Sequence, residues 1–194
     1  MRKIKGIIFY IYNFLLSKII KVFKIIEVED GVKFQGWPHI IKHNYARIII
    51  GSGTTINSSN YGYHVNMFSK CKLYASKNNA LIKVGKNTRI HGTCIHAFNK
   101  IVIGDKCLIA ANTQIIDSNG HELCFENPAA RISSPDKGRE IEIGNNVWIA
   151  TNCIILGGTS IGDGSIITAG SVVKGEVPAR CIYGGNPGKV IKMF

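Results

Sequence analysis

The run IIDSNGHE holds Asp117, Asn119, His121 and Glu122, polar side chains that could bind or activate a substrate. An imidazole titrates near neutral pH, and a carboxylate or carbonyl can fix its tautomer, so His121 is suited to act as a general base. A hydroxyl group is a poor nucleophile until such a base removes its proton. The pattern predicts proton transfer at His121, but an ordinary exposed loop histidine explains the spacing equally well.

A six-residue repeat surrounds this run and must position it. An aliphatic residue returns every six places from Ile143 to Val173, in IGNNVW, IATNCI, ILGGTS, IGDGSI and ITAGSV. This period is typical of a parallel β-helix, in which three hexads form one triangular coil. Each aliphatic residue should therefore stack on the one 18 positions later. Gly, Asn or Asp in the next place suits a corner with an unusual φ. Small fifth residues should share the interior: Cys107, Val147, Cys153, Ser165 and Ser171.

The repeat also sets the expected domain organisation. Weaker hexads begin at Ile50, Val84, Ile103 and Ile109 and stop after Ile115, and regular coil resumes at 143. We expect six or seven coils over residues 30–183, only loosely regular over 30–80, and a protruding loop over 121–140. Such a long interruption in a rigid stack is a candidate functional loop. The alternative is a scaffold without chemistry.

Composition narrows the function classes. The chain has 194 residues, 21 Gly, 5 Pro and a net charge of +12. Six basic residues and no acid lie in residues 1–26, so half of the excess charge is local, and no nucleic-acid motif accompanies it. We therefore expect no nucleic-acid partner. Six cysteines without a CxxC pair suggest a reducing compartment rather than disulfides or a metal site.

The N-terminal segment reads as a basic amphipathic helix within residues 1–29. Its uncharged run, residues 6–17, is shorter than the roughly 20 residues that a membrane span needs. A cleaved signal peptide is disfavoured because no A-x-A-like site follows. We expect peripheral attachment to the inner face of the cytoplasmic membrane, with packing against the β-helix or a neighbouring subunit as the alternative. The predicted apolar stripe is Ile4, Ile8, Ile11, Leu15, Ile19, Val22 and Ile26, with Lys5, Lys21 and Lys24 off it.

The runs IIDSNGHE, IEIGNNVWIA and YGGNPGKVIK, joined by the hexads, together resemble the hexapeptide-repeat acyltransferases over roughly residues 80–194. The nearest subset is the galactoside, maltose and surface-polysaccharide O-acetyltransferases. The resemblance implies a left-handed β-helix assembled as a homotrimer, with acetyl-CoA between subunits and no metal. It also implies that His121 deprotonates an acceptor hydroxyl, which attacks the thioester directly. Together with the basic helix, this suggests a saccharide or lipid-linked saccharide acceptor in lipopolysaccharide, capsule or exopolysaccharide synthesis.

The resemblance further implies contact residues in a tail over residues 184–194 and in the last coils. Acceptor contacts would come from Asp117, Asn119, Glu122, His91 and Trp148. Cofactor contacts would come from Trp148, Ala150, Thr151, Ala169, Gly170, Lys174, Gly175, Lys189 and Lys192. Three departures stand out: Gly188 replaces the usual Ala, Ala150 replaces a Gly, and the family's acceptor-binding Asn has no clear counterpart, since His91 or Thr93 stands near its place.

Two other enzyme classes share this repeat. A trimeric zinc enzyme would need ligands such as His91, His96 and His121, but their order in the chain is reversed and the tail motif would be unexplained. N-acetylation of a nucleotide-linked amino sugar often comes with an N-terminal nucleotide-binding βαβ unit, and no such pattern occurs here.

Overall fold

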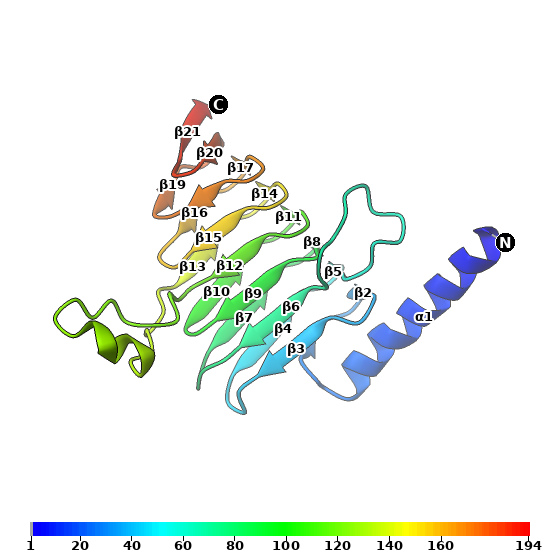
Figure 1. Cartoon of the computed structure of the whole chain (residues 1–194). Coiled ribbons are helices and arrows are strands. Elements are labelled where there is room, and N and C mark those ends of the chain that lie inside the picture. The colour runs from blue at the N-terminus through cyan, green and yellow to red at the C-terminus, as the bar shows by residue number, and fades with distance from the viewer. Residues whose placement is uncertain (1) are drawn as a thin grey trace.

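The computed structural model describes residues 2–194, with side chains from residue 6 onward. The predicted stripe and basic residues at Arg2, Lys3, Ile4 and Lys5 therefore have side chains outside the described part. The chain forms the expected left-handed parallel β-helix, with helix α1 (Arg2–Val22) against its first coil (Figure 1).

Three sheets form the sides of the β-helix. Sheet A contains β1 (Glu27–Val28), β4 (Arg47–Ile50), β7 (Leu81–Val84), β10 (Lys100–Ile103), β13 (Ile141–Ile143), β16 (Ser160–Ile161) and β19 (Glu176–Val177). Sheet B contains β2 (Lys33–Gln35), β5 (Thr55–Asn57), β8 (Arg89–His91), β11 (Leu108–Ile109), β14 (Trp148–Ile149), β17 (Ile166–Ile167), β20 (Cys181–Gly185) and β21 (Gly188–Met193). Sheet C contains β3 (His39–Lys42), β6 (Lys72–Ala75), β9 (Cys94–Ala97), β12 (Gln114–Ile116), β15 (Ile154–Leu156) and β18 (Val172–Val173). Strands pair in parallel except β20 with β21.

The core is a set of stacked aliphatic columns, as the hexad period predicts. Ile143 pairs with Ile161, and Ile149 pairs with Ile167, each 18 residues apart. The small fifth-place residues are buried beside these columns, Cys107 and Ser165 among them. Period and register are therefore confirmed, because each coil can bury its apolar face only against the next.

The corner prediction was wrong about which place needs the unusual φ. Positive φ falls at the fourth place of a hexad, as at Lys106 (55°) and Asn146 (56°). The second-place glycine is required by close stacking instead: a Cβ on Gly104 would lie 2.6 Å from the carbonyl oxygen of Gly144. Backbone proximity, not backbone conformation, selects glycine there.

Helix α1 packs with a different face from the predicted stripe. Leu16 and Ile20 are buried against the first coil, whereas Ile8 is 61% and Val22 73% exposed. Two polar side chains on the buried side fix the helix to β2. The Asn13 Oδ1 accepts a hydrogen bond from the Gly36 N–H at 2.8 Å, and the Ser17 Oγ accepts one from the Phe34 N–H at 3.0 Å.

None of the helices in residues 2–194 combines the length and apolar character needed to cross a bilayer.

Two loops leave the β-helix at different corners. We call the edge between sheets B and C corner BC, and the edge between sheets C and A corner CA. Loop 58–71 leaves corner BC between β5 and β6, and loop 117–140 leaves corner CA between β12 and β13. Figure 1 shows them projecting to opposite sides of the β-helix.

Candidate functional site

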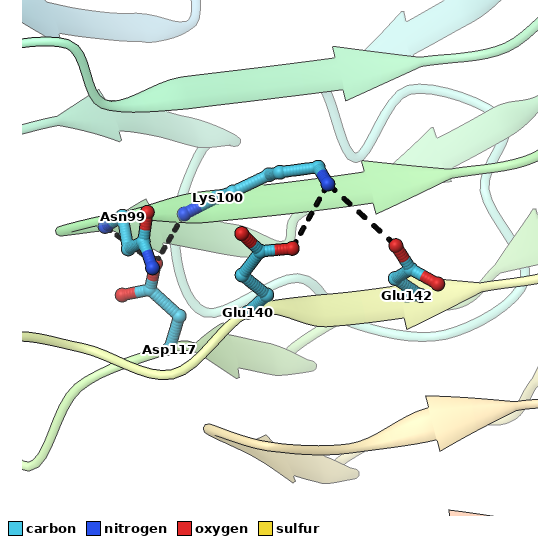
Figure 2. A network of polar contacts seen from close by, with 5 residues as sticks. All are labelled: Asn99, Lys100, Asp117, Glu140 and Glu142. Atoms are coloured by element: carbon cyan, nitrogen blue, oxygen red, sulfur yellow. Dashed lines mark hydrogen bonds and ion pairs between the residues drawn. The ribbon is translucent and has the colours of Figure 1, made fainter.

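Loop 117–140 starts from a buried carboxylate. Asp117 is fully buried, and its oxygens accept hydrogen bonds from the backbone N–H groups of Phe98 (2.7 Å), Asn99 (2.8 Å) and Lys100 (2.9 Å). Figure 2 shows the contacts with Asn99 and Lys100. Burial raises the pKa of Asp117, against the opposing effect of these hydrogen bonds. The expectation that Asp117 contacts substrate was therefore wrong, because its side chain faces the interior and fixes the base of the loop.

The two legs of the loop are paired with each other. Asp136 accepts a hydrogen bond from the Asn119 N–H at 2.8 Å, and this bond lowers the pKa of its carboxyl group. His121 forms an antiparallel bridge with Pro135, and the Glu122 N–H donates to the Ser134 carbonyl at 2.8 Å. The backbone that carries His121 is thus held by local pairing. Beyond it the tip forms a short 3-10 helix, η1 (Pro128–Ile132).

An open pocket of about 410 Å³ lies over these legs. It brings together three of the predicted residues, Asn119, His121 and Glu122. Two charged residues that the sequence analysis missed complete its polar lining, Asp136 and Arg139. Both fall at the end of the interruption just before coil resumes, which is the signal that could have marked them.

An exposed ion pair ties the returning leg to the β-helix. The Lys100 ammonium lies 2.9 Å from Glu140 and 3.6 Å from Glu142 (Figure 2). Such pairs contribute little to stability in water, so the buried Asp117 is the stronger anchor of the loop.

Four predicted cofactor positions form a strip along corner BC: Ala150, Thr151, Ala169 and Gly170. The Gly170 N–H donates to the Thr151 carbonyl at 3.0 Å, and the Thr151 hydroxyl donates to the Ala111 carbonyl at 2.7 Å. A Cβ on Gly170 would meet nothing within 4 Å. The strip therefore offers exposed backbone with small side chains, which suits the close approach of an extended ligand.

The remaining predicted positions lie elsewhere. Lys174 and Gly175 follow β18 at corner CA, on the same edge as His121. Trp148 is half exposed on the outer face of sheet B, between Leu108 and Ile166. The two tail lysines, Lys189 and Lys192, are exposed on β21, which pairs with β20 at the last coil.

His91, predicted as an acceptor contact, is largely covered in the single chain. It is 9% exposed, and its ring stacks on Tyr63 with centroids 4.4 Å apart. Its Nδ1 lies 3.1 Å from the Asn57 amide nitrogen. Burial, then the nearby Arg89 and His64, lower the pKa of His91 to about 4. Asn57 and Tyr63 therefore hold a neutral imidazole in place.

The three histidines of the zinc alternative are separated by their positions in the fold. His96 lies on sheet C, stacked on Tyr74 at 4.4 Å, whereas His91 lies under Tyr63 and His121 lies in the loop pocket. Within residues 2–194, no three potential ligands gather at one point.

The predicted base, His121, and the strip of predicted cofactor positions lie on different corners of one chain. Asn112, at corner BC, and Asp117, at corner CA, flank β12 and are five residues apart, or about 16 Å of extended strand. One copy of the chain therefore presents two half-sites on separate edges.

Comparison with known proteins identifies the family of this chain. The family model for bacterial transferase hexapeptide (six repeats) matches residues 140–175. The chain is 30% identical over 142 residues to an Escherichia coli K12 protein named "Putative lipopolysaccharide biosynthesis O-acetyl transferase WbbJ", covering 71% of this chain and 68% of that protein. The chain belongs to the hexapeptide-repeat acetyltransferase family. This membership makes it an acyltransferase.

Two further proteins are similar to this chain, one over part of its sequence and one in its fold. The galactoside O-acetyltransferase of Escherichia coli K12 is 38% identical over 92 residues, which cover 47% of this chain but only 42% of that enzyme. The structure of AntD, an N-acyltransferase of Bacillus cereus solved as a point mutant with dTDP and coenzyme A, superposes with a TM-score of 0.66 at 19% identity. That match covers 91% of this chain and 88% of AntD. At this identity the second match supports the fold alone.

Proposed function

We propose that this acyltransferase moves an acetyl group from acetyl-CoA to a sugar hydroxyl of a surface-polysaccharide precursor, with His121 as general base. One observation carries the proposal. The same chain presents an exposed histidine in a polar pocket at corner CA and a strip of small residues at corner BC. The relative named for lipopolysaccharide biosynthesis O-acetyl transfer supports the acceptor class.

A symmetric assembly of this chain would complete the site. Rotation about an axis parallel to the β-helix keeps every residue at its own height. His121 follows β12, whereas Ala111 precedes the same strand and Thr151 lies one coil above it. In a homotrimer with parallel axes, corner CA of one subunit would then face the strip on corner BC of the next. The acyl donor would lie between them.

The residues of both half-sites fit such a donor. CoA carries several phosphates, and Lys189, Lys192 and Lys174 are exposed cations near the last coil. The pantetheine arm is narrow and needs backbone access, which Ala169 and Gly170 give.

His121 would take the proton of the acceptor hydroxyl as the oxygen attacks the thioester carbonyl. A C–O bond forms, and the tetrahedral oxyanion is stabilised by nearby donors such as a backbone N–H. The C–S bond then breaks, and the protonated His121 returns its proton to the departing thiolate. Acetyl ester and free CoA thiol are the products, with no net change in protons.

The decisive test measures thiol release from acetyl-CoA by wild type and His121→Ala. The acceptors are methyl pyranosides of glucose, galactose, mannose and rhamnose, the same sugars joined to a polyprenyl phosphate, and glucosamine. We expect acceptor-dependent release that His121→Ala lowers by about 10²-fold or more. His43→Ala, an exposed turn histidine, should leave it unchanged.

Three results would overturn parts of the proposal. Faster acetylation of the glucosamine amine than of any hydroxyl would replace it with N-acetylation. Activity on free sugars alone would contradict the proposal that the acceptor is lipid-linked. A mass other than three times the 21.3 kDa chain in solution would remove the trimer.

We also propose that α1 attaches the enzyme to the inner face of the cytoplasmic membrane. The side of the helix turned away from the first coil carries exposed apolar residues, including Ile11 and Leu15, and Lys18 lies among them. An apolar face with neighbouring lysines suits an anionic lipid surface.

Vesicle flotation tests the attachment. Wild type should float with vesicles containing one third phosphatidylglycerol and less with pure phosphatidylcholine. The double variant Ile11→Asp/Leu15→Asp should remain in solution, while Tyr45→Asp, on an exposed turn, should float like wild type. Equal flotation of all three proteins would contradict the proposal.

A further inference from the structure

Loop 58–71 is a built element rather than a loose connection. The Asn60 amide closes it, donating to the Met67 carbonyl at 3.0 Å and accepting from the Met67 N–H at 2.7 Å. The Asn112 amide clamps it from two coils further on, donating to the Asn66 carbonyl at 3.0 Å and accepting from the Phe68 N–H at 2.9 Å. Two side-chain amides thus hold both legs of the loop.

Packing beneath the loop fixes its height on corner BC. Met67 is buried against Gly92, where a Cβ would lie 2.9 Å from the Met67 sulfur. Tyr63 lies on the His91 ring, and Asn57 holds that ring from below. The loop therefore has a defined inner side, made from the corner residues of three successive coils.

Several aromatic groups of the loop are exposed. Phe68 is 83% exposed and Tyr61 51% exposed. His64 is exposed beside Tyr63, with ring centroids 4.7 Å apart. A pyranose ring has an apolar C–H face and a rim of hydroxyls, so aromatic faces with an imidazole at their edge match its chemistry.

The loop also contacts the helix that carries the apolar face. The Phe9 and Tyr61 rings lie 4.7 Å apart, at an angle of 40°. A saccharide on the loop would therefore lie next to α1, where the lipid part of a lipid-linked acceptor would be held.

The height of the loop matches that of the catalytic base. Asn112, which clamps the loop, comes directly before β12, and His121 comes shortly after it. In the parallel trimer, loop 58–71 of one subunit would therefore reach the level of His121 of the partner subunit.

Resting on the proposed function, we infer that loop 58–71 is the acceptor-saccharide subsite, in which Tyr63, His64 and Phe68 present the sugar hydroxyl to His121 of the partner subunit. Asn57, His91 and Asn112 are positioning residues for this loop.

Steady-state kinetics of surface variants test the subsite. The acceptor is whichever methyl pyranoside or polyprenyl-linked sugar the wild type turns over. Phe68→Ala and His64→Ala should each raise the KM for this acceptor about tenfold and change the KM for acetyl-CoA less than twofold. Tyr45→Ala, which removes another well-exposed aromatic on a different turn, should match wild type. An unchanged acceptor KM, or a change confined to acetyl-CoA, would overturn the subsite while leaving the proposed function intact.

Mixed trimers test the arrangement across subunits. His121→Ala and Tyr63→Ala/His64→Ala chains, each with its own tag, are co-expressed and purified through both tags. Recovery of activity well above either parent supports a site shared between subunits, since some sites then have both elements intact. No recovery would overturn the shared site. Absence of turnover by the wild type on every acceptor would instead overturn the proposed function and this inference with it.

Discussion

The carboxylate of Asp117 accepts the backbone N–H of Asn99 at 2.8 Å, across 18 residues of sequence. This contact joins the end of β12 to the turn before β10, one coil earlier. Loop 117–140 therefore departs from a fixed point, and the buried side chain of Asp117 positions the backbone of His121, four residues away.

Asp117→Asn should destabilise the protein and weaken catalysis together. An amide NH₂ would replace one acceptor oxygen and face a backbone N–H, leaving a buried donor unsatisfied at a cost of about 1–3 kcal/mol. Urea unfolding and kcat are the measurements. Asp105→Asn is the matched control, because Asp105 accepts the Lys86 N–H at a corner where Asn145 performs the same task one coil on. Equal losses in both variants would contradict a special role for Asp117.

Stability should fall as the pH drops from about 7 towards 4, partly because of His91. Its folded pKa of about 4 lies below the ordinary value of 6.5. Between these values the unfolded chain binds a proton that the folded chain does not, so the stabilisation is complete above 6.5 and is lost below it. At about 1.4 kcal/mol per pKa unit, the full shift from 6.5 to about 4 corresponds to a loss of roughly 3.5 kcal/mol. His91→Asn should flatten the pH dependence of urea unfolding, whereas His43→Asn should not.

Gly188→Ala should lower the melting temperature, although Ala is the family's usual residue. A Cβ there would lie 2.9 Å from the Val172 carbonyl oxygen and collide with the Tyr183 ring. Overpacking of this kind costs about 1–3 kcal/mol. Replacing Tyr183 by Ala in the same chain should remove most of the added cost, because the side chain in the way is gone. Additive losses measured by thermal unfolding would show that Tyr183 is not the reason for glycine at this position.

Lys189→Ala and Lys192→Ala should each weaken acetyl-CoA binding about fivefold, the effect of losing one exposed ion pair of about 1 kcal/mol. Calorimetric titration measures the Kd. The loss should shrink at 0.5 M salt, because the interaction is electrostatic. Lys83→Ala, on the outer face of sheet A, should bind as wild type does. If both tail variants bind acetyl-CoA with the wild-type Kd, the predicted contacts between the tail lysines and the CoA phosphates are wrong.

The core could be predicted from sequence because its rule is local and repeated. Ile149 stacks on Ile167 since the coils after residue 143 have the same length, so one period determines their register. The packing face of α1 could not be predicted in this way. The helix is apolar on most sides, and Asn13 and Ser17 gain their role only from β2 N–H groups that the pattern does not reveal.

The candidate site was predictable only in part for the same reason. His121 and Glu122 follow the end of the hexads, and the structure keeps them in one pocket. Asp117 is also a polar residue just after the hexads, like His121 and Glu122, but its side chain points inward. Its direction depends on the backbone N–H groups of the neighbouring coil. Loop 58–71 has no period at all, and its clamp at Asn112 comes from more than 40 residues later.

The hydrogen bonds from Phe34 and Gly36 to α1 have a consequence for solubility. Both N–H groups belong to the first strand of sheet B or its end, where an incoming strand of another molecule would otherwise bind. At the far end, β21 runs antiparallel along β20 and covers the last strand in the same way. In a parallel β-helix, each end coil exposes strand edges onto which a further coil could stack. Here a helix covers the first strand of sheet B and a reversed strand covers its last parallel strand, so neither end of this sheet offers a parallel edge onto which a coil of another molecule could stack.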